Sequence, residues 1–228
     1  MSTLASRLEV IRQRIEAARA RRGGDAPVTL VAVAKKHPIA AIETALAAGL
    51  LDIGENYAQE LRDKRAALTD RRIHWHFIGP LQSNKVKTVV GEHILIHTVD
   101  RPALLDAIER RAAMRDLVID VLVQVNVARE AAKSGIAPEA LPALLDQFAP
   151  LAHVRCRGLM LIPPAGPPEA TRPHFAALRH LRDQQATIDR PNVHLRELSM
   201  GMSSDFEVAI EEGATLVRIG TELFGPRP

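Results

Sequence analysis

Lys35 ends an apolar run, Val31-Ala-Val-Ala, and its setting favours chemistry at the amine. Alternate side chains of a strand point to the same face, so Val31, Val33 and Lys35 share one face. Lys36 then points with the alanines to the other. A lysine beside a packed apolar core is desolvated, which lowers its pKa and makes its amine nucleophilic enough to form a Schiff base. One alternative is that Lys35 extends to the rim of the barrel and stays solvated. Another is that the alternation of the strand is displaced by one residue, which would place Lys36 on the interior face instead of Lys35.

The segment Ser199-Met-Gly-Met-Ser-Ser-Asp205 combines a glycine with residues that cap helices. Gly201 permits a tight turn, and a serine or the aspartate after it can cap the next helix. Backbone N–H groups at a helix start bind phosphate. Gly220 and Thr221, after another apolar run, add small-residue donors. We therefore expect a phosphate cradle that includes Ser203, Gly220 and Thr221, with a simple helix cap as the alternative for the serines alone.

Arg218 interrupts the apolar run Leu216-Val-Arg-Ile219. A charge in an apolar strand must be paired or bound to a ligand. Because Arg218 lies two residues before Gly220, its guanidinium can reach a ring held between the phosphate and the lysine. A salt bridge to Glu197 is the alternative. The lysine, the cradle and the arginine together indicate pyridoxal phosphate, although a barrel aldolase without a cofactor would use the same three parts on a sugar phosphate.

These residues need a scaffold that gathers the ends of several strands. Short apolar runs rich in β-formers alternate along the chain with stretches of helical period, which is typical of βαβ units and a parallel sheet. The strands are expected at 28–35, 51–54, 74–78, 94–98, 118–127, 154–162, 195–200 and 215–220. The helices are expected at 3–22, 39–49, 57–69, 83–90, 101–115, 138–148, 168–188 and 203–213.

The alternation permits a closed eight-stranded barrel or an open doubly wound sheet. Eight expected strands in 228 residues, with no extra edge element, favour an α/β fold with a single (β/α)8 TIM barrel and an additional N-terminal helix. We expect no helix after the last strand, and we hypothesise that the N-terminal helix covers that gap. The chemistry of such barrels lies at the C-terminal ends of the strands, where the candidate residues fall.

Composition indicates one globular domain over residues 1–228. The chain has 30 Lys+Arg against 27 Asp+Glu and is 46% hydrophobic, which excludes a disordered protein. One cysteine excludes a disulfide framework and a cysteine-based zinc site. The sequence has no run suited to a membrane helix and no signal peptide, so we expect a cytoplasmic protein without a membrane partner. Aromatic residues are only 3% of the chain and the arginines alternate with acids, which argues against nucleic-acid binding.

Three further side chains invite a functional interpretation that we do not adopt. His74 and His76 share a strand face, but no third ligand is evident, so we expect no metal site. Cys156 lies in an expected strand and is interpreted as a small buried hydrophobe.

Several sequence blocks, spread from about residue 28 to 225, carry a family resemblance. The blocks are Val31-Ala-Val-Ala-Lys-Lys-His-Pro38, Gly54-Glu-Asn-Tyr57, His74-Trp-His-Phe-Ile-Gly-Pro-Leu-Gln-Ser-Asn-Lys85, Lys133-Ser-Gly-Ile136, Gly158-Leu-Met160, Leu198-Ser-Met-Gly-Met-Ser-Ser-Asp205 and Val217-Arg-Ile-Gly-Thr221. Together they resemble the pyridoxal phosphate homeostasis protein family. The resemblance implies a barrel like the N-terminal domain of alanine racemase (fold type III), with pyridoxal 5'-phosphate (PLP) in Schiff-base linkage.

The resemblance also implies roles for individual residues. The family's lysine falls on Lys35, and its phosphate contacts fall on Ser203 and on the Gly220-Thr221 backbone. Arg218 matches the arginine that meets the pyridine nitrogen in the racemase-like group. Further cofactor-binding candidates in the matching blocks are Asn56, His76 and Met200. The sequence departs from the usual family pattern at Ala34, Lys36, His37 and Ile53.

The resemblance favours a carrier over an enzyme. Racemases of the related type use a tyrosine from an extra C-terminal β-domain as a second base. This sequence ends soon after the expected last strand, and its one tyrosine, Tyr57, begins an expected helix. We therefore expect a monomeric protein of PLP homeostasis, without catalytic residues, that binds PLP and hands it to PLP-dependent apoenzymes. The alternative is a weak, racemase-like PLP enzyme on amino acids with Lys35 as its base.

Overall fold

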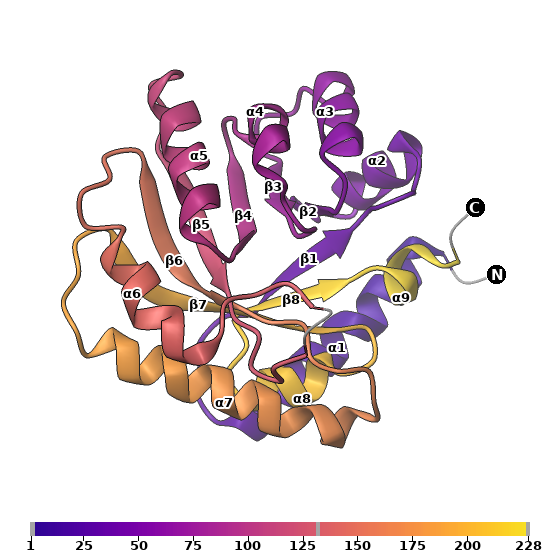
Figure 1. Cartoon of the computed structure of the whole chain (residues 1–228). Helices are drawn as coiled ribbons and strands as arrows, with labels where there is room; N and C mark the ends of the chain where they lie inside the picture. The colour runs from indigo at the N-terminus through magenta and orange to yellow at the C-terminus, as the bar shows by residue number, and fades with distance from the viewer. Residues whose placement is uncertain (1–2, 131–132, 227–228) are drawn as a thin grey trace.

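Parallel strands β1 to β8 close into a barrel in a computed structural model that describes residues 3–130 and 133–226. Each strand pairs with the next, and β8 pairs with β1 (Figure 1). The strand bounds are β1 (Thr29–Val33), β2 (Asp52–Glu55), β3 (His74–Phe77), β4 (Ile94–Val99), β5 (Ile119–Gln124), β6 (Val154–Met160), β7 (Val193–Met202) and β8 (Leu216–Ile219). The closed order confirms the expected barrel and excludes the open doubly wound sheet.

Helices surround the barrel in the ring seen in Figure 1. Their bounds are α1 (Leu4–Arg22), α2 (Ile39–Ala47), α3 (Ala58–Ala67), α4 (Val86–Val89), α5 (Pro102–Ala113), α6 (Leu141–Asp146), α7 (Pro168–Ala186), α8 (Phe206–Glu211) and α9 (Thr221–Phe224). Short 3₁₀ turns, η1 (Ser83–Lys85) and η2 (Pro138–Ala140), precede α4 and α6. None of the helices in the described ranges is long and apolar enough to cross a membrane.

Helix α1 completes the ring next to β8. It packs against α8 and α9, and one face carries its buried side chains, Leu4, Leu8, Ile11, Ile15 and Ala18. Arg14 ties the three helices together, because its guanidinium lies 2.9 Å from both Glu207 and Glu222 and sits over the ring of Phe206. The hypothesis that α1 covers this gap is therefore confirmed. The expectation that no helix follows the last strand was wrong by one turn, because α9 forms there.

Apolar side chains form two layers. A small cluster of Val31, Leu122, Met160 and Leu216, with Leu95 beside it, fills the barrel interior. The larger cluster contains the apolar residues of the helices and the strand residues that alternate with the interior ones, such as Ala32 and Val121. This alternation follows from the period of two in a strand, and it fixes which side chains of each strand reach the barrel axis.

Candidate functional site

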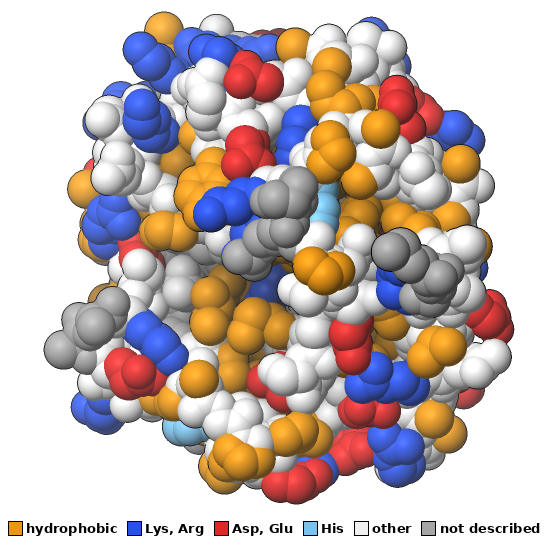
Figure 2. All heavy atoms as spheres, turned by 90° about the vertical axis from the view of Figure 1, so that its right-hand side faces the viewer, with side chains coloured by type: hydrophobic (Ala, Val, Ile, Leu, Met, Phe, Trp, Pro, Cys, Tyr) orange, Lys and Arg blue, Asp and Glu red, His pale blue; other side chains and the backbone are white. Residues whose placement is uncertain are grey.

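A cavity of about 310 Å³ opens at the C-terminal ends of the strands. Figure 2 looks onto this end of the barrel, where the surface is hollowed and apolar side chains line the recess. The lining residues are Val33, Lys35, Asn56, Ile78, Ile162, Met202, Ser203, Ser204, Arg218, Gly220 and Thr221. The cavity thus brings together most of the cofactor-binding candidates, in the place where barrel enzymes carry their chemistry. Its apolar walls were not predicted.

Lys35 follows β1 directly, in a turn. Val31 fills the barrel interior, and Val33 and Lys35 line the cavity, as the alternation of side chains predicted. Lys36 has a positive φ of 62°, which redirects the chain and leaves its side chain exposed. The geometry therefore places Lys35 at the cavity and Lys36 outside it.

Helix α3 holds the backbone on both sides of Lys35. The ammonium of Lys64 donates to the carbonyl oxygen of Ala34 at 2.9 Å. The backbone N–H of Lys36 donates to Glu60 Oε2 at 2.8 Å, and the same carboxylate pairs with Lys64 at 3.1 Å. The two peptide groups that flank Lys35 are thereby fixed by one i,i+4 ion pair.

Glu55, at the end of β2, completes this buried cluster. Its Oε1 lies 2.7 Å from Lys64 Nζ, and the side chains of both residues are buried. Burial raises the pKa of Glu55 to about 7, and the charge and hydrogen bond of Lys64 act in the opposite direction. This cluster was not predicted from the sequence. The spacing of Glu60 and Lys64 was a signal for an ion pair, but only the packing of α3 over the β1 turn gives the pair its role.

The segment after β7 forms the turn expected of a cradle. Gly201 has a φ of 89°, and a Cβ there would lie 2.9 Å from the Cα of Phe206, so a larger residue would not fit. The backbone N–H of Met202 donates to Asp205 Oδ1 at 2.7 Å, which closes the turn. Burial raises the pKa of Asp205 above its ordinary value. Ser203 lies within this turn, at the cavity wall.

Arg218 is buried at the inner wall of the cavity. Its Nη1 donates to Ser199 Oγ at 2.7 Å, and its Nη2 donates to the carbonyl oxygen of Leu161 at 2.9 Å. Burial lowers its pKa to about 10, while the negative charge of Asp205 acts in the opposite direction. Arg218 therefore stays cationic at neutral pH. The expected alternative, a salt bridge to Glu197, is not what the structure has, because Glu197 accepts from the hydroxyl of Thr215.

Two of the predicted cofactor ligands lie away from this cavity. His76 is buried inside the barrel and lines a different cavity, which opens at the N-terminal ends of the strands. Met200 is fully buried in the core layer between the barrel and the helices. Within the described ranges, no group of three or more His, Cys, Asp or Glu residues is arranged to hold a metal ion. Cys156 is fully buried, as expected.

Known proteins resemble this chain over nearly all of its length. The family model described as "Alanine racemase, N-terminal domain" matches residues 6–228. A "Pyridoxal phosphate homeostasis protein" of Aquifex aeolicus is 48% identical over 224 residues, which are 97% of each chain. The protein of the same name in Pseudomonas aeruginosa is 47% identical over 100% of this chain and 97% of its own. The solved structure of PipY from Synechococcus elongatus with PLP bound has a TM-score of 0.84 and 40% identity, covering 98% of this chain and 100% of PipY.

Proposed function

Because the chain belongs to the pyridoxal phosphate homeostasis protein family, we propose that it binds PLP in the cavity at the C-terminal ends of the strands. Lys35 holds the cofactor, as its amine condenses with the PLP aldehyde to a Schiff base and releases water. The observation that carries the proposal is that Lys35, Arg218 and the Ser203 turn surround one cavity. The PLP bound to PipY supports the choice of cofactor.

The cavity residues fit PLP chemically. Asn56 Oδ1 is buried in the cavity wall without a hydrogen-bond partner, so a bound ligand would supply one. A Cβ on Gly220 would lie 3.3 Å from the carbonyl oxygen of Val33, so the close approach to β1 at this position suits a glycine. Ser203 and Thr221, at the same mouth, offer hydroxyl and N–H donors that suit a phosphate. A cavity of about 310 Å³ lies at the lower end of the usual range for small ligands.

Arg218 determines what the bound cofactor can do. PLP supplies an aldehyde and a pyridine ring that, when protonated, draws electrons from a substrate. A cationic guanidinium donates a hydrogen bond to the ring nitrogen and disfavours its protonation. The ring then withdraws electrons weakly, so the bound cofactor stabilises a substrate carbanion less well.

The proposed role is therefore that of a PLP carrier, formed by residues 1–228 as one domain. It keeps PLP bound through Lys35 and gives it up to PLP-dependent apoenzymes. The printed name of the relatives supports this role in homeostasis. A monomeric state is part of the proposal. A cytoplasmic location stays a prediction.

Retention of PLP through gel filtration tests this function, with pyridoxal as the comparison. We expect one PLP per chain and weaker retention of pyridoxal, which lacks the phosphate. Equal retention of PLP and pyridoxal would contradict the proposal that the cavity binds the phosphate group. An assay of amino-acid enantiomers separates the carrier from an enzyme, because turnover near the ordinary ~10 s⁻¹ would overturn the carrier role.

A further inference from the structure

A chain of hydrogen bonds crosses the barrel interior and ends at Arg218. Four contacts form it: Asp52 Oδ1 to His76 Nε2 at 3.0 Å, His76 Nδ1 to His97 Nε2 at 2.9 Å, His97 Nδ1 to Ser199 Oγ at 2.8 Å, and Ser199 Oγ to Arg218 Nη1 at 2.7 Å. These side chains come from β2, β3, β4, β7 and β8. All except Asp52 are buried. The chain thus joins the two ends of the barrel.

When both imidazole rings are neutral, the acceptor at Asp52 fixes the direction of every hydrogen bond in this series. Asp52, as a carboxylate, can only accept, so His76 Nε2 carries a proton. In neutral His76 the other nitrogen accepts, and His97 must then donate from Nε2. His97 is neutral, because burial lowers its pKa well below the ordinary value. Its Nδ1 therefore accepts from the hydroxyl of Ser199, whose oxygen accepts from Arg218, a residue that can only donate.

This polarity suits a buried cation. Arg218 is buried, and its two hydrogen-bond acceptors, Ser199 and the Leu161 carbonyl, are neutral. A charge in a low-dielectric interior is stabilised by dipoles that point their negative ends toward it, and hydrogen bonds in series polarise one another. Every dipole in the chain points its negative end toward Arg218, and the carboxylate of Asp52 fixes that direction from the far end.

We propose that Asp52, His76, His97 and Ser199 are positioning residues that orient the guanidinium of Arg218 in the cavity wall. Two of its five N–H donors are committed to Ser199 and Leu161, and this sets the edge that it turns to the cavity. The consequence for PLP rests on the proposed function, but the polarity of the chain does not. His76 thereby acquires a role at the cofactor site without lining it.

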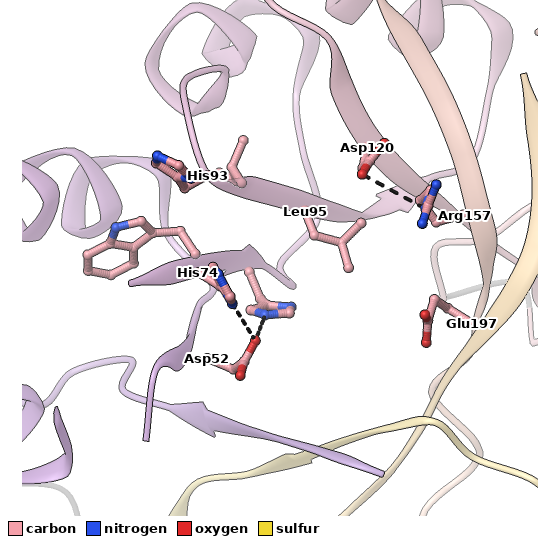
Figure 3. A pocket seen from close by; sticks show the side chains of 10 residues that line it. Asp52, His74, His93, Leu95, Asp120, Arg157 and Glu197 are labelled. Carbon is pink, nitrogen blue, oxygen red and sulfur yellow. Dashed lines mark hydrogen bonds and ion pairs between the residues drawn. The ribbon is translucent and has the colours of Figure 1, made fainter. Parts of the chain in front are cut away.

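The N-terminal cavity supplies a matched control. It has a volume of about 500 Å³, and Figure 3 shows Asp52 and His74 on one side, with Asp120, Arg157 and Glu197 on the other. Asp120 pairs with Arg155 at 3.0 Å and with Arg157 at 3.9 Å. Asp52 and Asp120 therefore line the same cavity, but only Asp52 belongs to the chain of hydrogen bonds that ends at Arg218.

The first test uses ¹⁵N NMR of the histidine rings in the protein without PLP, at pH 7.5. We expect His76 and His97 to be neutral with the proton on Nε2. A charged ring, or a proton on Nδ1 in either ring, would overturn the assignment. Asp52→Asn replaces a pure acceptor with a group that can accept or donate, so both tautomers become populated and the ring signals average. Asp120→Asn should leave the rings unchanged. No change in Asp52→Asn, or the same change in both variants, would contradict the role of Asp52.

The second test reads the effect at the cofactor site. Asp52→Asn should weaken PLP binding about threefold and shift the absorption maximum of bound PLP, whereas Asp120→Asn should do neither. Wild-type affinity and spectrum in Asp52→Asn would overturn the positioning role. If the wild-type protein does not bind PLP at all, the proposed function fails, while the ring tautomers still decide the polarity of the chain.

Discussion

The ammonium nitrogen of Lys64 lies 2.9 Å from the carbonyl oxygen of Ala34, the residue before the lysine that faces the cavity. The same nitrogen pairs with Glu55 at 2.7 Å and Glu60 at 3.1 Å. This hydrogen bond to a backbone carbonyl fixes the backbone just before Lys35. The position of Lys35 therefore depends on the side chain of Lys64, which does not line the cavity.

Lys64→Met should destabilise the protein. The variant removes the hydrogen bond to Ala34 and leaves Glu55 buried without its cation, and breaking a buried pair costs about 3 kcal/mol. The free energy of unfolding in urea measures the loss. Arg62→Met is the control, because Arg62 forms an exposed pair with Asp63 on the same helix and should change stability by less than about 0.5 kcal/mol. Equal effects would show that the buried cluster contributes no more than a surface pair.

Glu55 should make stability depend on pH. Its pKa in the folded protein is raised from 4.5 to about 7, so the folded state binds this proton more tightly than the unfolded state. The stability from this group is fully present below pH 4.5 and is lost as the pH rises through about 7; it amounts to at most about 3 kcal/mol. Urea unfolding of wild type and Glu55→Gln between pH 4.5 and 8 measures it. The wild type should lose stability relative to the variant over this window, and parallel pH profiles would contradict the raised pKa.

Ser203→Ala should weaken PLP binding about tenfold. The expected cause is loss of a hydrogen bond to a charged phosphate, and tenfold corresponds to about 1.4 kcal/mol. Ser83→Ala, which changes an exposed serine in η1, is the matched control and should leave affinity unchanged. Titration of PLP followed by absorbance measures both. Wild-type affinity in Ser203→Ala would show that the Ser203 hydroxyl does not contribute to phosphate binding.

Cys156 should be unreactive in the native protein. It is fully buried, and burial raises the pKa of its thiol to about 12, so almost none of the reactive thiolate is present at pH 8. Alkylation with iodoacetamide, followed by mass spectrometry, should label it only after denaturation. Labelling of the folded protein at the rate of a free thiol would show that the strand opens.

Features of the site that depend on the alternation of side chains within one strand could be predicted from the sequence. The apolar run before Lys35 placed that lysine on the interior face, and the polar ends of the strands located the cavity. The depth of a side chain along the barrel axis depends on how the strands are staggered, and the sequence of one strand does not determine this stagger. His76 therefore shares the interior face but lies too far from the strand end to line the cavity. Met200 lies where the register between β7 and β8 shifts, so alternation there does not predict its direction.

Contacts between segments that are distant along the chain could not be predicted from the sequence. The i,i+4 spacing of Glu60 and Lys64 indicates no more than a helix ion pair, and only the fold places this pair over the β1 turn. Ser199 read as part of a cradle motif, but it faces the interior and accepts from Arg218.

Borohydride reduction of the PLP-loaded protein, followed by peptide mass spectrometry, tests whether Lys35 holds the cofactor. Reduction converts the Schiff base to a stable amine, so the modified peptide identifies the lysine. We expect a pyridoxyl group on Lys35. A group on Lys36 or another lysine, or no modified peptide, would contradict it.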